Sequence, residues 1–530
     1  MKEIDRREFL GAAAAAGVAI SAMGTSTLAG RATQSFELEE ATIADMRAMM
    51  DKGEITAAQL TDMYLKRIAS VDKQINSIIE VNPDARKIAA ERDRERKDGK
   101  PLGPLHGIPV VLKDNIDTAD RMKTTAGSLA LLSAPVPKND AHLVEKLREA
   151  GAVILAKANL SEWANFRSTE SVSGWSGRGG QTRNPYMLDR NPCGSSSGSA
   201  AATASNLAAA AIGTETDGSI VCPASICGVV GLKPTVGLVS RSGIIPIAHS
   251  QDTAGPMTRT VMDAAIMLNA IQGADPRDPV TSQLDDRPAV DYTELLKPVG
   301  LKGVRIGVAR DYWGRRPEVD EVSNKALDVL KKAGAELIDF KFPTIGKFRA
   351  AEFEVLLYEF KAGLEKYLAE RGGEHKTLAE LIEFNSDNAS REMPYFKQEI
   401  FEQAAAKGSL ESKEYKDALE LCQRLSRTEG IDAVMHDHNL DAIVAPTNAP
   451  TWLIDFVNGD CGSNYVSSSS FAAVSGYPSI TVPAGFVKEL PIGVSFFGKA
   501  WSEAMLLRVA YAFEQGSKAR RKPKFLATAK

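Results

Sequence analysis

Gly107-Ile-Pro-Val-Val-Leu112 and Ala152-Val-Ile-Leu-Ala156 are two short apolar stretches, and a helix-like segment, residues 141–150, lies between them. β-Branched residues favour strands, and a strand followed by a helix and a second strand is the usual connection between parallel strands. These residues therefore predict an α/β fold with parallel pairing near its centre.

The sequence on either side of this unit alternates between helical and strand-like patterns. The expected order is a helical N-terminal part (36–95), a central core (100–265), a helical cover (318–430) and closing strands (440–500). Strand-type segments thus occur at both ends of the chain, which favours one large sheet over several independent domains. We expect a single large domain, residues 33–530, with helices on both faces of a central twisted mixed β-sheet.

The middle of the chain has an unusual composition. Residues 174–256 are rich in Gly, Ser and Ala and poor in charged side chains. Small residues let backbones approach closely, as they do at the centre of a domain. Within this region residues 200–211, which are mostly Ala, predict a buried helix.

The first 32 residues have the organisation of an export signal. Arg6-Arg7 precedes a Phe-Leu pair and an Ala-rich, weakly apolar run from Gly11 to about Met23. This order is typical of a twin-arginine signal peptide, and the run is short for a membrane-spanning helix. We expect removal of residues 1–32, export to the periplasm and no stable membrane span afterwards. The alternatives are a disordered tail and a single membrane anchor.

Charge and cysteine content argue against several functional classes. The formal net charge is −4 over 530 residues, and no cluster of Lys and Arg is interleaved with aromatic residues. A nucleic-acid partner is therefore not expected. The five cysteines lack the spacing of a zinc site and are too few for a disulfide framework. Buried free thiols are favoured, a single bridge stays open, and we expect neither a metal nor a cofactor.

Lys113 is the first candidate catalytic residue. It ends the apolar stretch that begins at Gly107, so we expect its amine to be partly removed from water. Loss of hydration disfavours the charged ammonium and lowers its pKa, which makes a neutral amine available as a base. The alternative is a surface lysine paired with Asp114.

Two segments rich in Ser and Gly supply candidate nucleophiles. Residues 193–200 read Cys-Gly-Ser-Ser-Ser-Gly-Ser-Ala, and hydroxyl and N–H groups at a helix start can converge on one point. They also contain Gly-x-Ser-x-Gly, which would make Ser196 the nucleophile of an α/β-hydrolase elbow. Residues 213–220 read Gly-Thr-Glu-Thr-Asp-Gly-Ser-Ile, in which Ser219 follows backbone N–H groups able to stabilise an oxyanion.

These segments together resemble the amidase signature family. The surrounding motifs are Lys-Ala-Asn-Leu-Ser-Glu-Trp-Ala-Asn-Phe (157–166), Gly-Gly-Gln-Thr-Arg-Asn-Pro-Tyr (179–186) and Gly-Val-Val-Gly-Leu-Lys-Pro-Thr (228–235). With residues 107–115 upstream and 478–498 downstream, the resemblance covers most of the chain after the signal. The form Glu-Thr-Asp-Gly-Ser-Ile-Val-Cys-Pro is most similar to the bacterial peptide amidase branch, which removes the C-terminal amide from peptide amides.

The resemblance implies a catalytic triad. Lys113 corresponds to the family's base, Ser195 to its bridging serine, which follows a cis peptide bond, and Ser219 to its nucleophile. Proton transfer from Ser219 through Ser195 to neutral Lys113 would allow attack on the amide carbon and formation of an acyl-enzyme.

The same resemblance places an oxyanion hole at the main-chain N–H groups of Thr216, Asp217 and Gly218. One position departs from the family pattern, because many members carry arginine two residues after the nucleophile and this chain has Val221. The implied substrate is a small amide or a peptide amide.

Other functions are weighed against this one. A Ser-His-Asp hydrolase would need a histidine placed after an acidic residue downstream of Ser196, and none is suitably placed. His436 and His438 could begin a metal site but lack further ligands, so a solvated helix end is favoured.

The remaining alternatives concern the family itself. A catalytically silent binding subunit is disfavoured because all three catalytic residue types are present. A glutamine-dependent transamidation subunit is disfavoured by the export signal. An aryl acylamidase or another small-amide amidase stays open beside the peptide amidase, and the oligomeric state is not predicted.

Overall fold

The structure is a computed structural model that describes residues 36–298, 300–460, 462 and 465–529. The expected signal peptide, residues 1–32, and Cys461 lie outside the described residues. The described residues from Glu37 onward form one compact unit.

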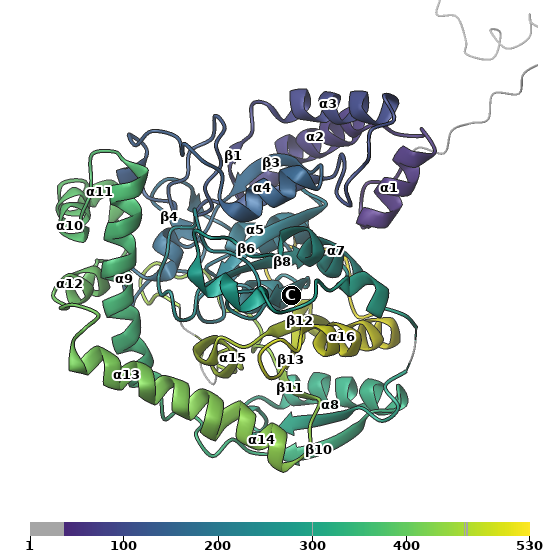
Figure 1. Ribbon diagram of the computed structural model, residues 1–530, viewed down its shortest axis with the longest axis vertical. Coiled ribbons are helices and arrows are strands. Elements are labelled where there is room, and N and C mark those ends of the chain that lie inside the picture. Colours follow the sequence, from purple (N-terminus) through teal and green to yellow (C-terminus); the bar gives the residue numbers. More distant parts are fainter. Residues whose placement is uncertain (1–35, 299, 461, 463–464, 530) are drawn as a thin grey trace, which may run out of the picture. The chain divides into compact units, whose positions relative to one another are not determined.

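One mixed sheet of eleven strands runs through the described part of the chain (Figure 1). Its strands are β1 (Ile78–Val81), β2 (Pro109–Lys113), β3 (Val153–Ala158), β6 (Ala210–Glu215), β7 (Val230–Lys233), β8 (Thr253–Thr258), β9 (Arg305–Ala309), β10 (Glu336–Phe340), β11 (Ala442–Pro446), β12 (Ser479–Val487) and β13 (Leu490–Phe497). The short strands β4 (Trp175–Ser176) and β5 (Gly180–Gln181) pair with each other outside it.

The order across the sheet is β1-β3-β2-β6-β8-β7-β12-β13-β11-β9-β10. The pairs β2–β3 and β2–β6 are parallel, as the strand–helix–strand pattern predicts, and so are β9–β10 and β9–β11. Between the two parallel groups lie β8, β7 and the late strands β12 and β13, which are joined by antiparallel pairs. The expectation of one large mixed sheet closed by late strands is confirmed.

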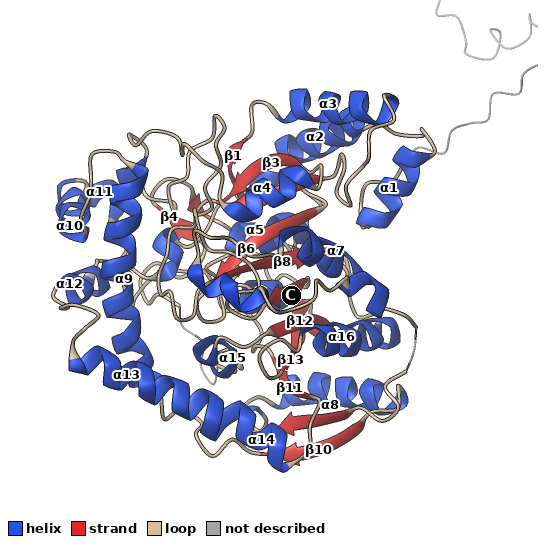
Figure 2. Ribbon diagram, in the orientation of Figure 1, coloured by secondary structure: helices blue, strands red, loops and turns tan. Residues whose placement is uncertain are grey.

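Helices flank this sheet, as Figure 2 shows in blue beside the red strands. They are α1 (Ile43–Asp51), α2 (Ala57–Ile75), α3 (Ala85–Lys97), α4 (His142–Glu149), α5 (Ser197–Ala204), α6 (Val221–Ile226), α7 (Val261–Ile271), α8 (Pro317–Lys332), α9 (Arg349–Arg371), α10 (Leu378–Asp387), α11 (Ala389–Glu392), α12 (Glu399–Ala405), α13 (Lys413–Gln423), α14 (Asp432–Asp437), α15 (Ser470–Ser475) and α16 (Glu503–Ser517). Helices α4, α7, α16 and α8 contact one another in that order, whereas α5 and α6 pack on the central strands and on each other.

The first two helices begin with capping boxes. Thr42 accepts a hydrogen bond from the main chain of Asp45, whose carboxylate bonds back to the Thr42 main chain, and Thr56 and Gln59 do the same for α2. Such capping boxes satisfy N–H groups that have no partner inside the helix.

Two predicted segments differ from the structure. The expected helix over residues 200–211 is two elements, because α5 ends at Ala204 and the chain turns at Asn206, with φ of 58°, into β6. A strand covered on both faces has no polar alternation, so its Ala-rich sequence resembles a helix.

The region 318–430 was expected to be helical throughout, but it also contains β10. This strand pairs in parallel with β9 at the edge of the sheet, and Phe340 is the one fully buried residue among its five. Partial exposure gives an edge strand the charged composition of the surrounding helices.

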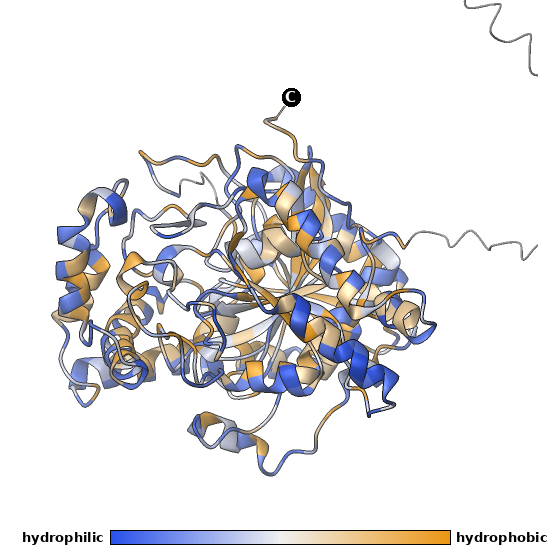
Figure 3. Ribbon diagram, turned by 90° about the horizontal axis from the view of Figure 1, so that it is seen from above, coloured by the Kyte–Doolittle hydropathy of each residue, from blue (hydrophilic) through white to orange (hydrophobic). Residues whose placement is uncertain are grey.

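The helical cover packs around a buried apolar cluster that includes Leu357, Phe360 and Phe401. Helix α9 (green in Figure 1) lies beside α10, α12 and α13. Figure 3 shows hydrophilic residues along the outer helices and apolar ones toward the strands. Among the described residues, no helix combines the length and apolarity needed to cross a bilayer.

Candidate active site

Lys113 is held at the carboxyl edge of the sheet. It is the last residue of β2, whose parallel neighbour β6 ends at Glu215, so the ends of both strands meet at one place. The Lys113 Nζ atom lies 2.7 Å from Ser195 Oγ, 2.8 Å from Thr214 Oγ1 and 3.1 Å from the Thr214 carbonyl oxygen. Asn115 also donates a hydrogen bond to Thr214 Oγ1, at 3.0 Å. The Lys113 side chain is fully buried, so the alternative of a surface lysine is wrong.

Burial lowers the pKa of Lys113 to about 7, and the negative charges of Asp252 and Glu215 partly oppose this shift. Desolvation penalises the ammonium more than the neutral amine, which is the expected direction for a buried lysine. Near neutral pH, a large fraction of Lys113 is therefore an uncharged amine in contact with a serine hydroxyl.

Ser195 and Ser196 have different surroundings. The peptide bond between Gly194 and Ser195 is cis, as the family resemblance implied. The Ser196 hydroxyl accepts a hydrogen bond from the Thr214 N–H at 3.1 Å and donates one to the Thr214 carbonyl at 3.0 Å. It is fully buried, and within the described residues no histidine hydrogen-bonds to it. The α/β-hydrolase elbow at Ser196 is therefore wrong.

The loop that carries Ser219 has unused hydrogen-bond donors. Over the described part of the chain, the main-chain N–H groups of residues 216–219 donate to no protein acceptor. The next two, of Ile220 and Val221, donate to Glu215 Oε2 at 2.7 and 2.9 Å. Glu215 thus accepts from the two N–H groups that follow Ser219. The four consecutive N–H groups of residues 216–219 stay free to bind a ligand oxygen.

The two serine segments are joined through their backbones. The Ser196 N–H donates to the Ser219 carbonyl at 3.1 Å. Within the described residues no hydrogen bond links the Ser195 and Ser219 hydroxyls, and the Ser219 hydroxyl has no protein partner. Ser219 is 9% exposed, whereas Ser195 is fully buried. The structure therefore forms one contact of the expected relay and leaves the Ser219 hydroxyl free.

Sequence comparisons decide the family. A family model described as Amidase matches residues 59–507, which is most of the chain. The chain belongs to the amidase signature family. A probable amidase of Arabidopsis thaliana is 42% identical over 508 residues, 94% of each chain. The native peptide amidase of Stenotrophomonas maltophilia is 52% identical, with 92% of this chain and 99% of that one covered and a TM-score of 0.87.

A glutamyl-tRNA(Gln) amidotransferase component of Thermoanaerobacter pseudethanolicus is also similar, at 37% identity over 93% of this chain and 100% of that protein. Membership of the amidase signature family makes this chain an amidohydrolase. The relatives differ in what their names say they act on, so the family does not select one amide.

A disulfide corrects the prediction that the cysteines of this amidase are free thiols. Cys193 and Cys222 are bridged, with their Cα atoms 6.1 Å apart, whereas Cys227 and Cys422 are free and buried. The bridge joins the segment before Ser195 to the helix after Ser219. Trp452 packs against it from the loop that follows β11.

His436, considered above as part of a metal site, lies at the surface. His436 is at the end of α14, and its side chain is 84% exposed, so the solvated helix end is confirmed. In the described ranges no group of three or more His, Cys, Asp or Glu side chains is placed to hold a metal ion.

A cavity of about 500 Å³ borders the site on the side of Asn115, Thr214 and Thr216. It extends to α9, where Tyr367 and Arg371 line it. Neither Ser195 nor Ser219 is among its lining residues, so this cavity is not assigned as the amide-binding cleft.

Three residues that contact the site lie in or near the motifs quoted from the sequence, but the sequence analysis assigned them no role. Thr214 and Glu215 lie inside the quoted Gly-Thr-Glu-Thr-Asp-Gly-Ser segment, and Asn115 follows Lys113 by two residues. Glu215 offered a signal, because it is an acidic residue at the end of an apolar strand. Asp252, whose charge acts on Lys113, is distant in sequence and offered none.

Proposed function

We propose that this amidase hydrolyses the C-terminal carboxamide of peptide amides through a relay from Ser219 through Ser195 to Lys113. The supporting observation is the 2.7 Å contact between the buried Lys113 amine and the Ser195 hydroxyl, beside a loop with unused N–H donors. The 52% identity to a peptide amidase supports the choice of substrate.

In the first step the neutral Lys113 amine accepts the proton of Ser195 while Ser195 accepts the proton of Ser219. The Ser219 oxygen then attacks the carboxamide carbon. The N–H groups of Thr216, Asp217 and Gly218 stabilise the oxyanion, since oriented donors that need no rearrangement favour the transition state.

In the second step the relay returns a proton to the nitrogen of the tetrahedral intermediate. An amide nitrogen leaves poorly as an anion, so this proton is required for departure of ammonia. A water molecule then attacks the Ser219 ester, gives its proton to the same relay and releases the carboxylate product.

The relay requires one movement. The Ser219 side chain must turn its hydroxyl toward Ser195 when substrate binds. Catalytic hydrogen bonds often tighten only in the substrate complex, and the Ser219 hydroxyl has no competing protein partner among the described residues.

The test is a substrate panel. The purified protein is incubated with a dipeptide amide, an acyl anilide and an aliphatic amide, and released ammonia and amine are quantified, with S219A as the blank. We expect ammonia from the dipeptide amide without cleavage of its internal peptide bond. Turnover of the anilide alone would make the chain an aryl acylamidase, and cleavage of the internal bond would contradict the proposal.

We also propose export to the periplasm by the twin-arginine route. The Arg6-Arg7 motif and the Ala-rich run support it, and so does the Cys193–Cys222 disulfide, because disulfides persist in oxidising compartments. Replacement of both arginines by lysine should retain the protein in the cytoplasmic fraction. Unchanged periplasmic recovery of that variant would contradict this route.

A further inference from the structure

A buried carboxyl group of the helical cover reaches the loop that carries Ser219. Glu352 lies in the first turn of α9 and is 7% exposed. The Gln251 amide nitrogen is 3.2 Å from Glu352 Oε1 and 3.2 Å from the Thr216 carbonyl oxygen. One amide group therefore joins Glu352 to the main chain of the Ser219 loop.

Asp217, the next residue of that loop, is held from the other side. Its Oδ2 atom accepts a hydrogen bond from the Ser470 hydroxyl at 2.7 Å, at the start of α15. Its Oδ1 atom is buried and accepts no hydrogen bond from a donor group of the described residues. A buried carboxylate oxygen without a donor is costly, so a protonated neighbour is the natural partner.

Glu352 is that neighbour. Burial raises the pKa of Glu352 well above its ordinary value, and the charge of Asp217 raises it further. A side-chain hydrogen bond between the two carboxyl groups also raises the pKa of Glu352, which favours a protonated Glu352 able to donate to Asp217.

Other groups around Glu352 affect its pKa less than burial and Asp217 do. Gln251 donates to it, and Arg349 of the same helix lowers its pKa slightly. The Cys422 thiol of α13 also lies near Glu352, because a negative charge on Glu352 raises the pKa of that thiol. Asp217 is therefore the main charged partner of Glu352.

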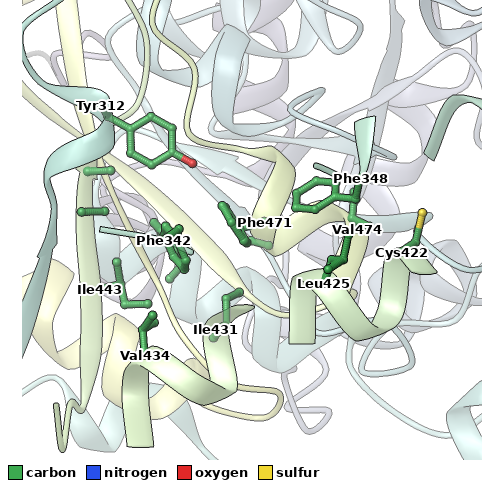
Figure 4. Packing of buried hydrophobic residues seen from close by; sticks show 14 of the residues in the cluster. Tyr312, Phe342, Phe348, Cys422, Leu425, Ile431, Val434, Ile443, Phe471 and Val474 are labelled. Atoms are coloured by element: carbon green, nitrogen blue, oxygen red, sulfur yellow. The ribbon is translucent and has the colours of Figure 1, made fainter. Parts of the chain in front are cut away.

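Apolar packing fixes the starts of α9 and α15 relative to each other. In Figure 4, Phe471 lies between Phe342 and Phe348. Its ring centroid is 3.8 Å from that of Phe342 and 5.2 Å from that of Phe348. Phe348 precedes α9 and Phe471 is the second residue of α15, so this stack sets the positions from which Glu352 and Ser470 reach Asp217.

We propose that Glu352 is a positioning residue whose protonated carboxyl holds Asp217, and with it the N–H groups of residues 216–218, in the conformation that stabilises the oxyanion. This inference rests on the proposed function of that loop. Ionised Glu352 would place a second negative charge beside Asp217 and near the developing oxyanion, which opposes catalysis. The rate should therefore fall on the alkaline side, where Glu352 loses its proton.

The experiment compares pH profiles of kcat and kcat/KM for the wild type, E352Q, E352A and E359Q. Gln at 352 can donate to Asp217 and accept from Gln251 without ionising. E359Q is the matched control, because Glu359 is a fully buried acid of the same helix whose partners are Ser250, Tyr415 and His249.

We expect E352A to lose about 10- to 100-fold in kcat with a smaller change in KM, since the affected donors act on the transition state. E352Q should retain most of the wild-type kcat and shift the alkaline limb of the pH profile upward by one pH unit or more. E359Q should keep the wild-type alkaline limb.

Three outcomes would overturn the inference: an E352Q alkaline limb that coincides with that of the wild type, an E352Q loss of kcat equal to that of E352A, or a wild-type rate that does not fall at alkaline pH. E352Q carries the test if E352A does not fold. The pH profiles are measured with whichever amide of the substrate panel is hydrolysed. If the proposed substrate is wrong, the panel shows it, and the alkaline limbs of the variants can still be compared.

Discussion

The Ser/Gly/Ala-rich core and the Glu/Lys-rich helical cover pack in opposite ways. All eight residues of α5 in the core are buried, and Gly198 of that helix lies directly against the main chain of Asn159 and Ser77. The long cover helix α9 has a polar outer side, and its Gly363 faces only the ring of Pro246.

This difference predicts which parts of the fold fix the catalytic side chains most tightly. Core elements touch backbone to backbone, so a displacement of the chain moves the Lys113, Ser195 and Ser219 side chains directly. Cover elements contact the core through side chains, which can adjust, apart from the first turn of α9 near Glu352. We expect substitutions in the core to have large effects and those in the cover to have small ones.

The largest effect is expected at Ser219. S219A should lower the rate of amide hydrolysis by about 10⁴-fold or more, because the attacking oxygen is removed. Its stability should be unchanged, since the hydroxyl has no protein partner in the described residues. Steady-state kinetics and thermal unfolding measure both. Loss of turnover in S196A together with normal turnover in S219A would reverse the assignment of the two serines.

A large effect is also expected at Lys113. In the wild type the rate should rise with pH through about 7, because Lys113 is a protonated, inactive ammonium below its pKa and a neutral base above it. K113M should lower kcat by about 10³-fold and remove this acid limb. The measurement is the pH dependence of kcat/KM.

Lys157 provides the control for that variant. It is a second fully buried lysine, at the adjacent strand β3, and its amine donates to Thr124 Oγ1 at 2.8 Å. K157M should keep the acid limb. If K157M loses the limb and K113M keeps it, Lys113 is not the base.

A pair of glycine variants tests the packing contrast directly. A Cβ atom at Gly198 would overlap the carbonyl oxygens of Ser77 and Asn159 and lie 2.7 Å from the Asn159 nitrogen, so G198A should destabilise the protein by about 3 kcal/mol or more. A Cβ atom at Gly363 would lie 3.2 Å from Pro246 Cγ, and G363A should stay within about 1 kcal/mol of the wild type. Denaturant unfolding measures both, and equal losses would refute the contrast.

The smallest effect is expected on the outer side of the cover. Lys325 and Glu321 of α8 form an ion pair of 2.7 Å, with both side chains about 70% exposed. K325A should change the free energy of unfolding less than either glycine variant above, and salt should reduce the difference. A double-mutant cycle with E321A measures the pair. A coupling energy that persists at high salt would show that the outer side of the cover is more constrained than proposed.

Local features of this chain were predictable from its sequence. The capping residues Thr42 and Thr56, the strand ending at Lys113 and the parallel unit around residues 107–156 each depend on residues close together in the chain. The motif around Ser195 and Ser219 also indicated the family, which the comparison over residues 59–507 confirms. Such features are readable because capping, periodicity and motif spacing act over a few residues.

Only the tertiary structure decided how distant parts meet. It pairs Cys193 with Cys222, commits the Ser196 hydroxyl to Thr214, ends α5 at Ala204 and brings Glu352 to the loop of Asp217. Each of these depends on the space and the charges that segments far apart in the sequence leave for one another. Burial also raises the pKa of Glu352 and lowers that of Lys113, and burial is a property of the whole fold, so no local pattern contains it.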